Sequence, residues 1–257
     1  MLQNSAGVAA QPLRAFASLR ETDFSRKDAK ARRKARRSKL SSRMFAALLL
    51  MIACASFVSA QNDSEYKLKR GDNELGFWGG GAFTATTVFG GLTDAEAEDR
   101  KFVVAAFRYG RTLAASDHLA LQYTLDAIPM ALAVGNVESE TTVTTPAGPV
   151  TTLTRGTAYG AGVTPLGLQL DFANGSRVKP FVHVNGGLLF FNKSVPLPDA
   201  GRLALVGEAG AGLRIFTSAR RAVNFGVRFH HISNGDRAGS NRGLNQFVFY
   251  AGFSIFK

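Results

Sequence analysis

The chain has 257 residues and a formal net charge of +12, and this charge is concentrated at one end. Residues 1–60 carry 12 Lys and Arg against 3 Asp and Glu, whereas residues 61–257 carry 19 against 16. The excess therefore belongs to the N-terminal segment, so the charge of the whole chain does not indicate a nucleic-acid-binding protein. Residues 1–43 are basic and lack apolar periodicity, which predicts a disordered extension.

This extension is long for a segment that precedes an export signal. We favour the explanation that translation begins at Met44 or just upstream of it. The alternative is a genuine basic tail that binds an acidic partner. N-terminal sequencing of the native product would distinguish the two.

An apolar run of about 15 residues, Met44 to Val58, follows the basic residues and ends in small side chains. This pattern predicts a secretory signal peptide over residues 44–60. The run is shorter than the roughly 20 residues of a membrane span, so a short transmembrane anchor is the weaker alternative. Another alternative is a lipoprotein, because Ile52-Ala53-Cys54 loosely resembles a lipoprotein cleavage box. Cleavage after Ala60 would leave a mature chain without cysteine.

The remainder, residues 61–257, alternates between apolar and polar residues and contains no run long enough for a transmembrane helix. We predict an all-β fold, an eight-stranded antiparallel outer-membrane β-barrel. The expected strands are 74–89, 101–112, 117–130, 156–173, 178–193, 202–217, 220–233 and 244–256. Short turns alternate with long polar loops, which is typical of such barrels, and the long loops should face outward. The expected long loops are 90–100, 134–155, 194–201 and 234–243.

Each expected strand has one apolar face and one face with isolated charges. A soluble barrel would turn the charges to water, whereas a membrane barrel turns them into its lumen. The signal peptide, the many glycines and the aromatic closing run 247–256 favour the membrane, with a lipocalin-like soluble barrel as the alternative. Because an eight-stranded barrel is narrow, we expect a packed polar lumen in which the charges pair, and no open pore. The charges expected to pair there are Asp126, Asp171, Glu208, Arg214 and Arg228.

Near the C-terminus, His231 and Ser233 continue the apolar, lipid-facing stripe of strand 220–233. Two residues apart on a strand, their side chains leave the same face about 6.5–7 Å apart. Polar side chains that face lipid cost free energy unless they lie near the membrane interface. A polar pair on this stripe therefore indicates a function at the interface. A histidine could take the serine proton while the serine attacks a lipid ester. By contrast, His230 should face the lumen as an interior histidine, and Trp78 should be an interface anchor.

The segments His231-Ile232-Ser233-Asn234-Gly235 and Asn241-Arg242-Gly243-Leu244-Asn245 resemble the outer-membrane lipid A 3-O-deacylase (acyloxyacyl hydrolase) family. The resemblance implies a barrel that removes an ester-linked acyl chain from lipid A, with lipopolysaccharide and outer-membrane lipids as partners. It implies His231 as general base and Ser233 as nucleophile. It further implies that Asn234 and the backbone of the turn at Gly235 bind the oxyanion.

The chain departs from the family at the acid, because Asn245 stands where the family has a glutamate. Asn245 could orient His231 but could not stabilise an imidazolium by charge. We considered Asp236 as a substitute carboxylate. The competing interpretations are a non-catalytic barrel with a degenerate triad and a small ligand-binding or channel barrel. The sequence contains no metal or cofactor motif that we recognise.

Overall fold

The computed structural model describes residues 64–87 and 91–257. The predicted extension 1–43 and signal peptide 44–60 lie outside the described residues. Within the described part, one antiparallel sheet has the order β1-β3-β4-β5-β6-β7-β8-β9, and β1 pairs with β9 to close the ring. The short β2 continues the line of β1 along β9. The predicted eight-stranded antiparallel barrel is therefore confirmed.

The strands agree with the expected segments with two exceptions: the strand expected over 74–89 is interrupted at residues 83–84, and one long connection is itself a pair of strands. Their bounds are β1 Asn73–Ala82, β2 Ala85–Thr86, β3 Lys101–Ala115, β4 Leu119–Thr145, β5 Gly148–Phe172, β6 Val178–Phe191, β7 Leu203–Ser218, β8 Arg221–Ser233 and β9 Leu244–Phe256. Two short helices are also described, η1 (Ser64–Tyr66) and α2 (Asp94–Ala97). Neither of these two helices could cross a membrane.

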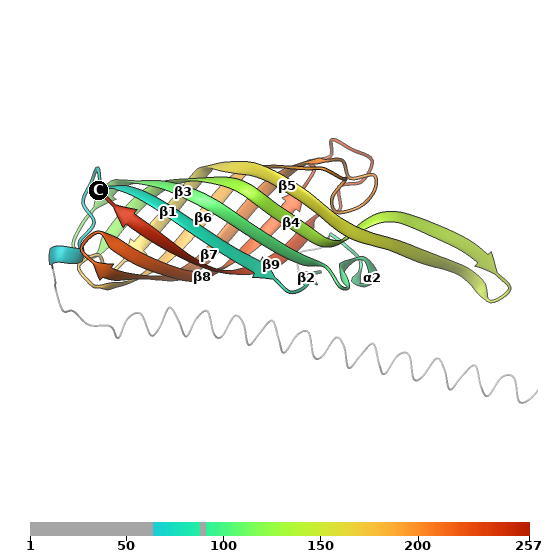
Figure 1. The fold of residues 1–257 in the computed structure, drawn as a ribbon, viewed down its shortest axis with the longest axis horizontal. Helices are drawn as coiled ribbons and strands as arrows, with labels where there is room; N and C mark the ends of the chain where they lie inside the picture. Colours follow the sequence, from blue (N-terminus) through green and yellow to red (C-terminus); the bar gives the residue numbers. More distant parts are fainter. Residues whose placement is uncertain (1–63, 88–90) are drawn as a thin grey trace, which may run out of the picture. The chain divides into compact units, whose positions relative to one another are not determined.

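The connection expected as a loop over 134–155 is instead a β-ribbon, so that prediction was wrong. Strands β4 and β5 continue past the barrel and pair as far as Thr145 and Gly148 (Figure 1). β-Branched residues dominate this ribbon and favour extended backbone. Thr142 and Thr151 share a hydrogen bond of 2.9 Å across it. Most side chains of its tip are exposed on both faces, so the sequence lacks the apolar alternation that marks a half-buried strand.

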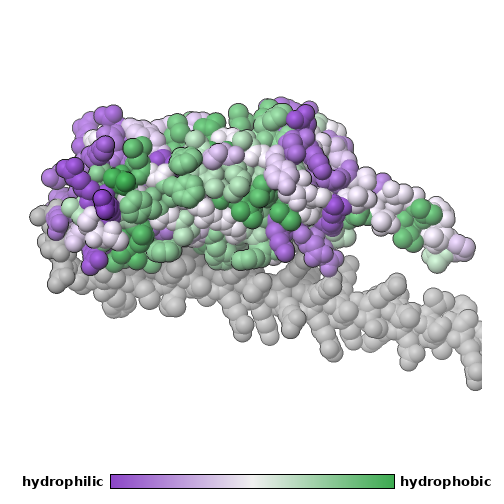
Figure 2. Space-filling model, in the orientation of Figure 1, coloured by the Kyte–Doolittle hydropathy of each residue, from purple (hydrophilic) through white to green (hydrophobic). Residues whose placement is uncertain are grey.

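The long connections meet at the end of the barrel that carries α2 and the β4–β5 ribbon, and we call this end the long-loop rim (Figure 1). The short turns lie at the opposite end, the short-turn rim. Figure 2 shows apolar side chains along the middle of the barrel wall and polar side chains at both ends. Outward residues of this band include Leu75, Phe77, Phe107, Val184, Phe225 and Phe253.

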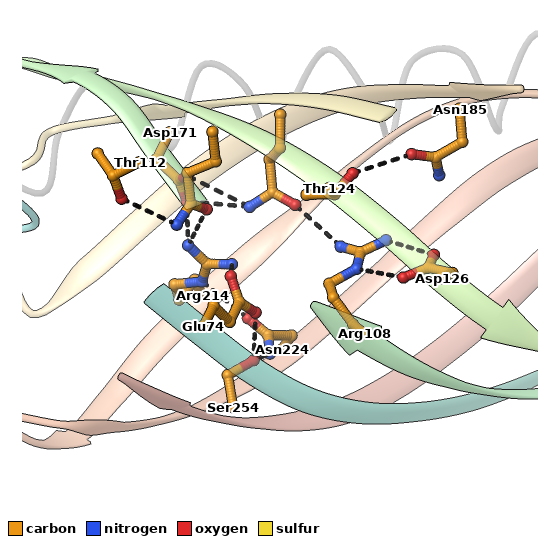
Figure 3. Close-up of polar contacts among 12 residues, drawn as sticks. Glu74, Arg108, Thr112, Thr124, Asp126, Asp171, Asn185, Arg214, Asn224 and Ser254 are labelled. Carbon is orange, nitrogen blue, oxygen red and sulfur yellow. Dashed lines mark hydrogen bonds and ion pairs between the residues drawn. The ribbon is translucent and has the colours of Figure 1, made fainter. Parts of the chain in front are cut away.

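The lumen holds the charged side chains, as expected for a membrane barrel (Figure 3). Arg214 donates to Glu74 at 2.8 Å and to Asp171 at 3.1 Å. Arg108 binds both carboxylate oxygens of Asp126 at 2.7 Å. These groups are almost fully buried, and a buried charge is tolerated only when it is paired and hydrogen-bonded. The inverted arrangement, apolar outside and paired charges inside, excludes the soluble-barrel alternative.

The same lumen contains Arg228, which donates to Glu208 at 2.7 Å and stacks on Trp78 with 3.9 Å to the ring centroid. Trp78 is therefore buried in the lumen, and its expected role as an interface anchor was wrong. His230 faces inward as predicted, and its Nδ1 lies 2.7 Å from Glu208 Oε1. Paired side chains thus fill the lumen, which argues against an open channel.

Candidate active site

The alternation of β8 places consecutive residues on opposite sides of the barrel wall. Arg228 and His230 are buried in the lumen, whereas His231 and Ser233 are half-buried on the outer wall. Ser233 is the last residue of β8, so the pair lies at the long-loop rim. This is the face and the end of the strand that the sequence predicted.

Asn245 lies directly across from His231 in the β8–β9 ladder. Nδ1 of His231 and Oδ1 of Asn245 are 2.6 Å apart. Because an amide oxygen only accepts hydrogen bonds, Nδ1 carries the proton and Nε2 is the basic nitrogen. Asn245 is only 2% exposed, although Phe249 on the same face of β9 is 51% exposed. The dyad therefore has a fixed tautomer and a sheltered orienting group.

Two glycines form a wall behind the histidine ring. A Cβ at residue 243 would lie 2.6 Å from Cε1 of His231, closer than van der Waals contact allows. Gly91 lies behind Gly243, because a Cβ at residue 91 would lie 2.3 Å from the Gly243 oxygen. Gly91 also has a φ of +93°, which favours glycine. The close packing leaves the ring of His231 little freedom to rotate.

On its other side, His231 faces open space. Gly207 pairs with His231 across the β7–β8 ladder, and Gly186 pairs with Gly207 in the next strand. Apart from Gly207 and its two neighbours in the chain, no atom of the described residues lies within 4 Å of the position that a Cβ on Gly207 would occupy. A row of glycines on the outer wall thus leaves space for a chain-like group beside the imidazole.

Ser233 is next along the same face, opposite Leu205 of β7. Within the described residues, the structure contains no hydrogen bond between Ser233 and His231. His231 is therefore hydrogen-bonded to Asn245, whereas Ser233 lies beside them without a hydrogen bond to His231 in this structure. Catalytic hydrogen bonds of this kind often tighten only when substrate binds.

The turn after Ser233 is held by the side chain of Asn234. Its Nδ2 donates to the carbonyl oxygens of Ala200 at 2.9 Å and Ser240 at 2.6 Å. Its Oδ1 accepts from the Asp236 N–H at 2.9 Å. Both amide hydrogens are thus engaged within the loops, so this side chain positions the turn in the conformation seen. A role for Asn234 in binding the oxyanion stays a prediction.

The backbone N–H of Asn234 donates to Oδ1 of Asn241 at 3.2 Å, so the next backbone donor after Ser233 is that of Gly235. Its φ is +61°, and its N–H has no hydrogen-bond partner among the described residues. Asp236 is exposed, and the structure gives its carboxylate no contact with His231 in the described part of the chain. The arrangement favours the Gly235 N–H as an oxyanion donor and leaves the hypothesis about Asp236 without geometric support.

Sequence reasoning missed the link between α2 and the site. Arg242, one residue before Gly243, donates to Glu96 of α2 at 2.5 Å. Burial opposes ionisation of Glu96, but hydrogen bonds from Thr93 and the charges of Arg242 and Arg100 hold its pKa below the ordinary value. Thr93 and Glu96 form a capping box, a spacing that is visible in the sequence. Thus α2 holds the chain segment that backs His231.

The fold and the site define a β-barrel of the outer-membrane type that carries a His-Ser-Asn constellation on its outer wall. The described residues include no group of His, Cys, Asp or Glu side chains that could hold a metal ion. A family model described as lipid A 3-O-deacylase (PagL) matches residues 110–254, more than half of the chain. The chain therefore belongs to the PagL lipid A 3-O-deacylase family.

Solved structures similar to the chain include the outer-membrane enzyme PagL, with 16% identity and a TM-score of 0.45, covering 70% of this chain and 97% of that one. Neisserial surface protein A has 12% identity and a TM-score of 0.40, with coverages of 72% and 96%. The N-terminal barrel of Pseudomonas aeruginosa OprF has 10% identity and a TM-score of 0.39, with coverages of 74% and 100%. No curated protein sequence matches the chain.

Proposed function

We propose that this protein is a serine esterase that removes an ester-linked acyl chain from lipid A in the outer membrane. The observation that carries the proposal is the His231–Asn245 pair, 2.6 Å apart on the lipid-facing wall beside Ser233. At the rim of the barrel this pair lies near the membrane interface, where polar groups cost little free energy and can meet the ester bonds of a lipid. Membership of the PagL family supports lipid A as the substrate.

In the proposed reaction, Oγ of Ser233 attacks the ester carbonyl while Nε2 of His231 takes the hydroxyl proton. The negative charge on the carbonyl oxygen accepts a hydrogen bond from the Gly235 N–H. The carbon–oxygen ester bond then breaks, and the imidazolium returns its proton to the departing sugar alkoxide. Water hydrolyses the acyl-serine by the same steps, which releases the fatty acid and restores Ser233.

With Asn245 in place of a carboxylate, we expect this reaction to be slower than in an enzyme that has an acid at this position. Its amide oxygen orients His231 but carries no charge to stabilise the imidazolium. In a serine protease, replacing the acid by its amide lowers turnover by roughly 10⁴. We therefore expect measurable but low activity.

The signal peptide predicted over residues 44–60 would export the protein to the outer membrane, and the site would then lie close to lipid A. In the family's barrels the long loops face outward. The long-loop rim would then lie in the outer leaflet, where lipid A is found. His231 and Ser233 would meet the ester bonds between the sugar headgroup and the acyl chains.

Mass spectrometry of lipid A tests the proposal. The full chain and its Ser233→Ala variant would be expressed in a Gram-negative host, with the folded barrel verified by heat-modifiable mobility in gels. Loss of one acyl chain in the wild type alone supports the proposed esterase. Unchanged lipid A in both samples, with both barrels folded in the outer membrane, would reject lipid A as the substrate.

A non-catalytic barrel is the second candidate function. It is favoured by the amide at Asn245 together with the missing hydrogen bond between Ser233 and His231. A neutral chromogenic ester separates the two candidates, because a silent site hydrolyses neither lipid A nor the reporter ester. Hydrolysis that depends on Ser233 excludes the second candidate.

A further inference from the structure

Two arginines lie on the two loops that meet at the long-loop rim, Arg237 beside the turn that follows Ser233 and Arg202 just before β7. Arg237 lies on the β8–β9 loop, and its Nε donates to the carbonyl oxygen of Asn234 at 3.0 Å. A Cβ on Gly235 would lie 3.8 Å from this same nitrogen, so the guanidinium sits over the turn. Arg202 precedes β7, and its Nε donates to the Phe191 carbonyl at 3.0 Å.

The two arginines belong to chain segments in direct contact. A Cβ on Gly201 would lie 3.4 Å from the Cβ of Ala238. Arg202 directly follows Gly201, and Arg237 directly precedes Ala238, so their backbones are neighbours across the two loops. Asn234 joins the same loops through its bond to Ala200.

Both guanidinium groups have donors to spare. Each uses only Nε on a backbone carbonyl, and the terminal nitrogens have no hydrogen-bond partner within the described ranges. Asp199 and Asp236 are close in sequence, yet neither forms an ion pair with Arg202 or Arg237. Arg242 differs, because it is paired with Glu96. Arg202 and Arg237 are exposed at the rim and offer planar sets of N–H groups that match a phosphate or carboxylate.

An apolar surface runs from these arginines along the outer wall. It consists of Leu188 and Phe190 of β6 and Leu203 and Leu205 of β7, each between 37% and 52% exposed. Leu205 pairs with both Leu188 and Ser233 in the ladders, so this surface reaches the nucleophile. The Arg202 guanidinium lies 4.7 Å from the ring centroid of Phe190, directly over the apolar surface.

We propose that Arg202 and Arg237 form a phosphate-binding site for a sugar-phosphate lipid headgroup, whose acyl chains lie on the apolar surface below. This inference rests on the proposed function and deepens it, because it names the group that holds the substrate lipid. Two arginines that form no ion pair in the described structure lie beside an apolar surface, and this combination suits a lipid with an anionic headgroup. With the phosphate held at the rim, an ester at the base of the headgroup reaches Ser233.

A binding experiment without turnover tests this site. The full chain carrying Ser233→Ala, in a neutral detergent, would be titrated with lipid A and with the same lipid A after enzymatic removal of its phosphates. Native mass spectrometry resolves protein with and without bound lipid. Adding Arg202→Gln and Arg237→Gln should lower the affinity for phosphorylated lipid A by about tenfold or more. The affinity for dephosphorylated lipid A should change by less than about twofold, because no charge pair is lost.

Arg220→Gln with Arg221→Gln at the short-turn rim is the matched control, since it removes the same charge far from the site and should change neither affinity. Competition by inorganic phosphate, lost in the double variant at the site, supports recognition of the phosphate itself. Equal losses for both forms of lipid A, or no loss for either, would overturn the inference. Wild-type protein that binds in this way but deacylates nothing would instead reject the proposed esterase.

Discussion

His231 and Asn245 are paired residues of neighbouring strands, and Nδ1 of His231 lies 2.6 Å from Oδ1 of Asn245. The backbone ladder on both sides fixes the distance between their Cα atoms. The dyad is therefore as rigid as the barrel wall, and changes to either side chain should act on chemistry more than on folding.

Asn245→Glu should raise the rate of ester hydrolysis. A carboxylate at this position keeps the tautomer of His231 and adds a charge that stabilises the imidazolium. We expect an increase in kcat of about 10² or more, within the roughly 10⁴ that separates acid from amide in serine proteases. The measurement is hydrolysis of a chromogenic ester by purified barrels. An Asn245→Ala variant is the control and should be slower than wild type. A glutamate variant no faster than wild type would contradict the role given to Asn245.

Gly243→Ala should slow the reaction without unfolding the barrel. The new methyl group would approach Cε1 of His231 to 2.6 Å, so the ring or the loop has to move. A displacement of about 1 Å at a catalytic group costs on the order of 10² in rate. Kinetics should show a lower kcat with a similar KM. Gly79→Ala is the matched control, because its nearest neighbour would be 3.6 Å away. Equal effects of the two changes would indicate a general loss of stability.

Gly207→Phe should discriminate between long and short acyl chains. The position beside His231 is open, so a large side chain fills space on the outer wall and leaves the strand pairing intact. If the substrate chain occupies this space, hydrolysis of long-chain esters should fall by about tenfold or more, whereas acetyl esters should be spared. Comparing kcat/KM for a series of chain lengths measures this. A uniform loss across the series would place the acyl chain elsewhere.

Glu96 should make the α2 segment sensitive to acid. Because its pKa is lowered in the folded protein, its ion pair with Arg242 is fully present above the ordinary pKa of about 4.5. The stabilisation is lost as the pH falls through the lowered pKa. We expect the protection factors of the amides in residues 91–100 and 241–245, which are corrected for the intrinsic exchange rate at each pH, to fall at acid pH by a factor equivalent to about 1 kcal/mol.

Glu96→Gln should remove this pH dependence and give low protection factors at every pH. Glu98→Gln is the control, because the structure gives the Glu98 side chain no described partner. Protection factors that depend equally on pH in all three proteins would show that Glu96 does not hold the segment.

Replacing residues 141–152 by Asn-Gly should leave the barrel intact. The ribbon tip is exposed on both faces and buries little apolar area, and an isolated two-stranded ribbon is only marginally stable. The new turn would connect Glu140 and Leu153, which are paired in the ladder, and it keeps Leu153 packed against the core. Heat-modifiable mobility and melting temperature should match those of the full chain. A barrel that no longer folds would assign the ribbon a part in assembly.

The sequence predicted the barrel well because the membrane imposes a simple rule on every strand. Charged residues such as Asp126 and Arg214 must face the lumen, and Phe225 must face the lipid. The alternation of polar and apolar residues in the sequence therefore identifies each strand and the side that each residue faces. The same rule placed His231 and Ser233 on the outer wall. Trp78 could have been assigned by this rule too, because it shares its face of β1 with the buried Glu74.

The features that the sequence did not predict depend on other forces. The ribbon tip meets water on both faces, so no alternation marks it. The wall of Gly91 and Gly243 and the bond from Arg242 to Glu96 join residues that are far apart in the chain. Nothing in the local pattern of either segment identifies its partner.

The position of Asn245 also bears on when the site comes into existence. Asn245 lies on the last strand, between His231 on β8 and Thr86 on β2, and the β1–β9 pairing is the contact that closes the ring. An incomplete barrel lacks that pairing and leaves Asn245 uncovered. The β8–β9 pairing that joins Asn245 to His231 needs no closed ring, but the shelter of Asn245 on its other side is completed only when the first strands reach β9.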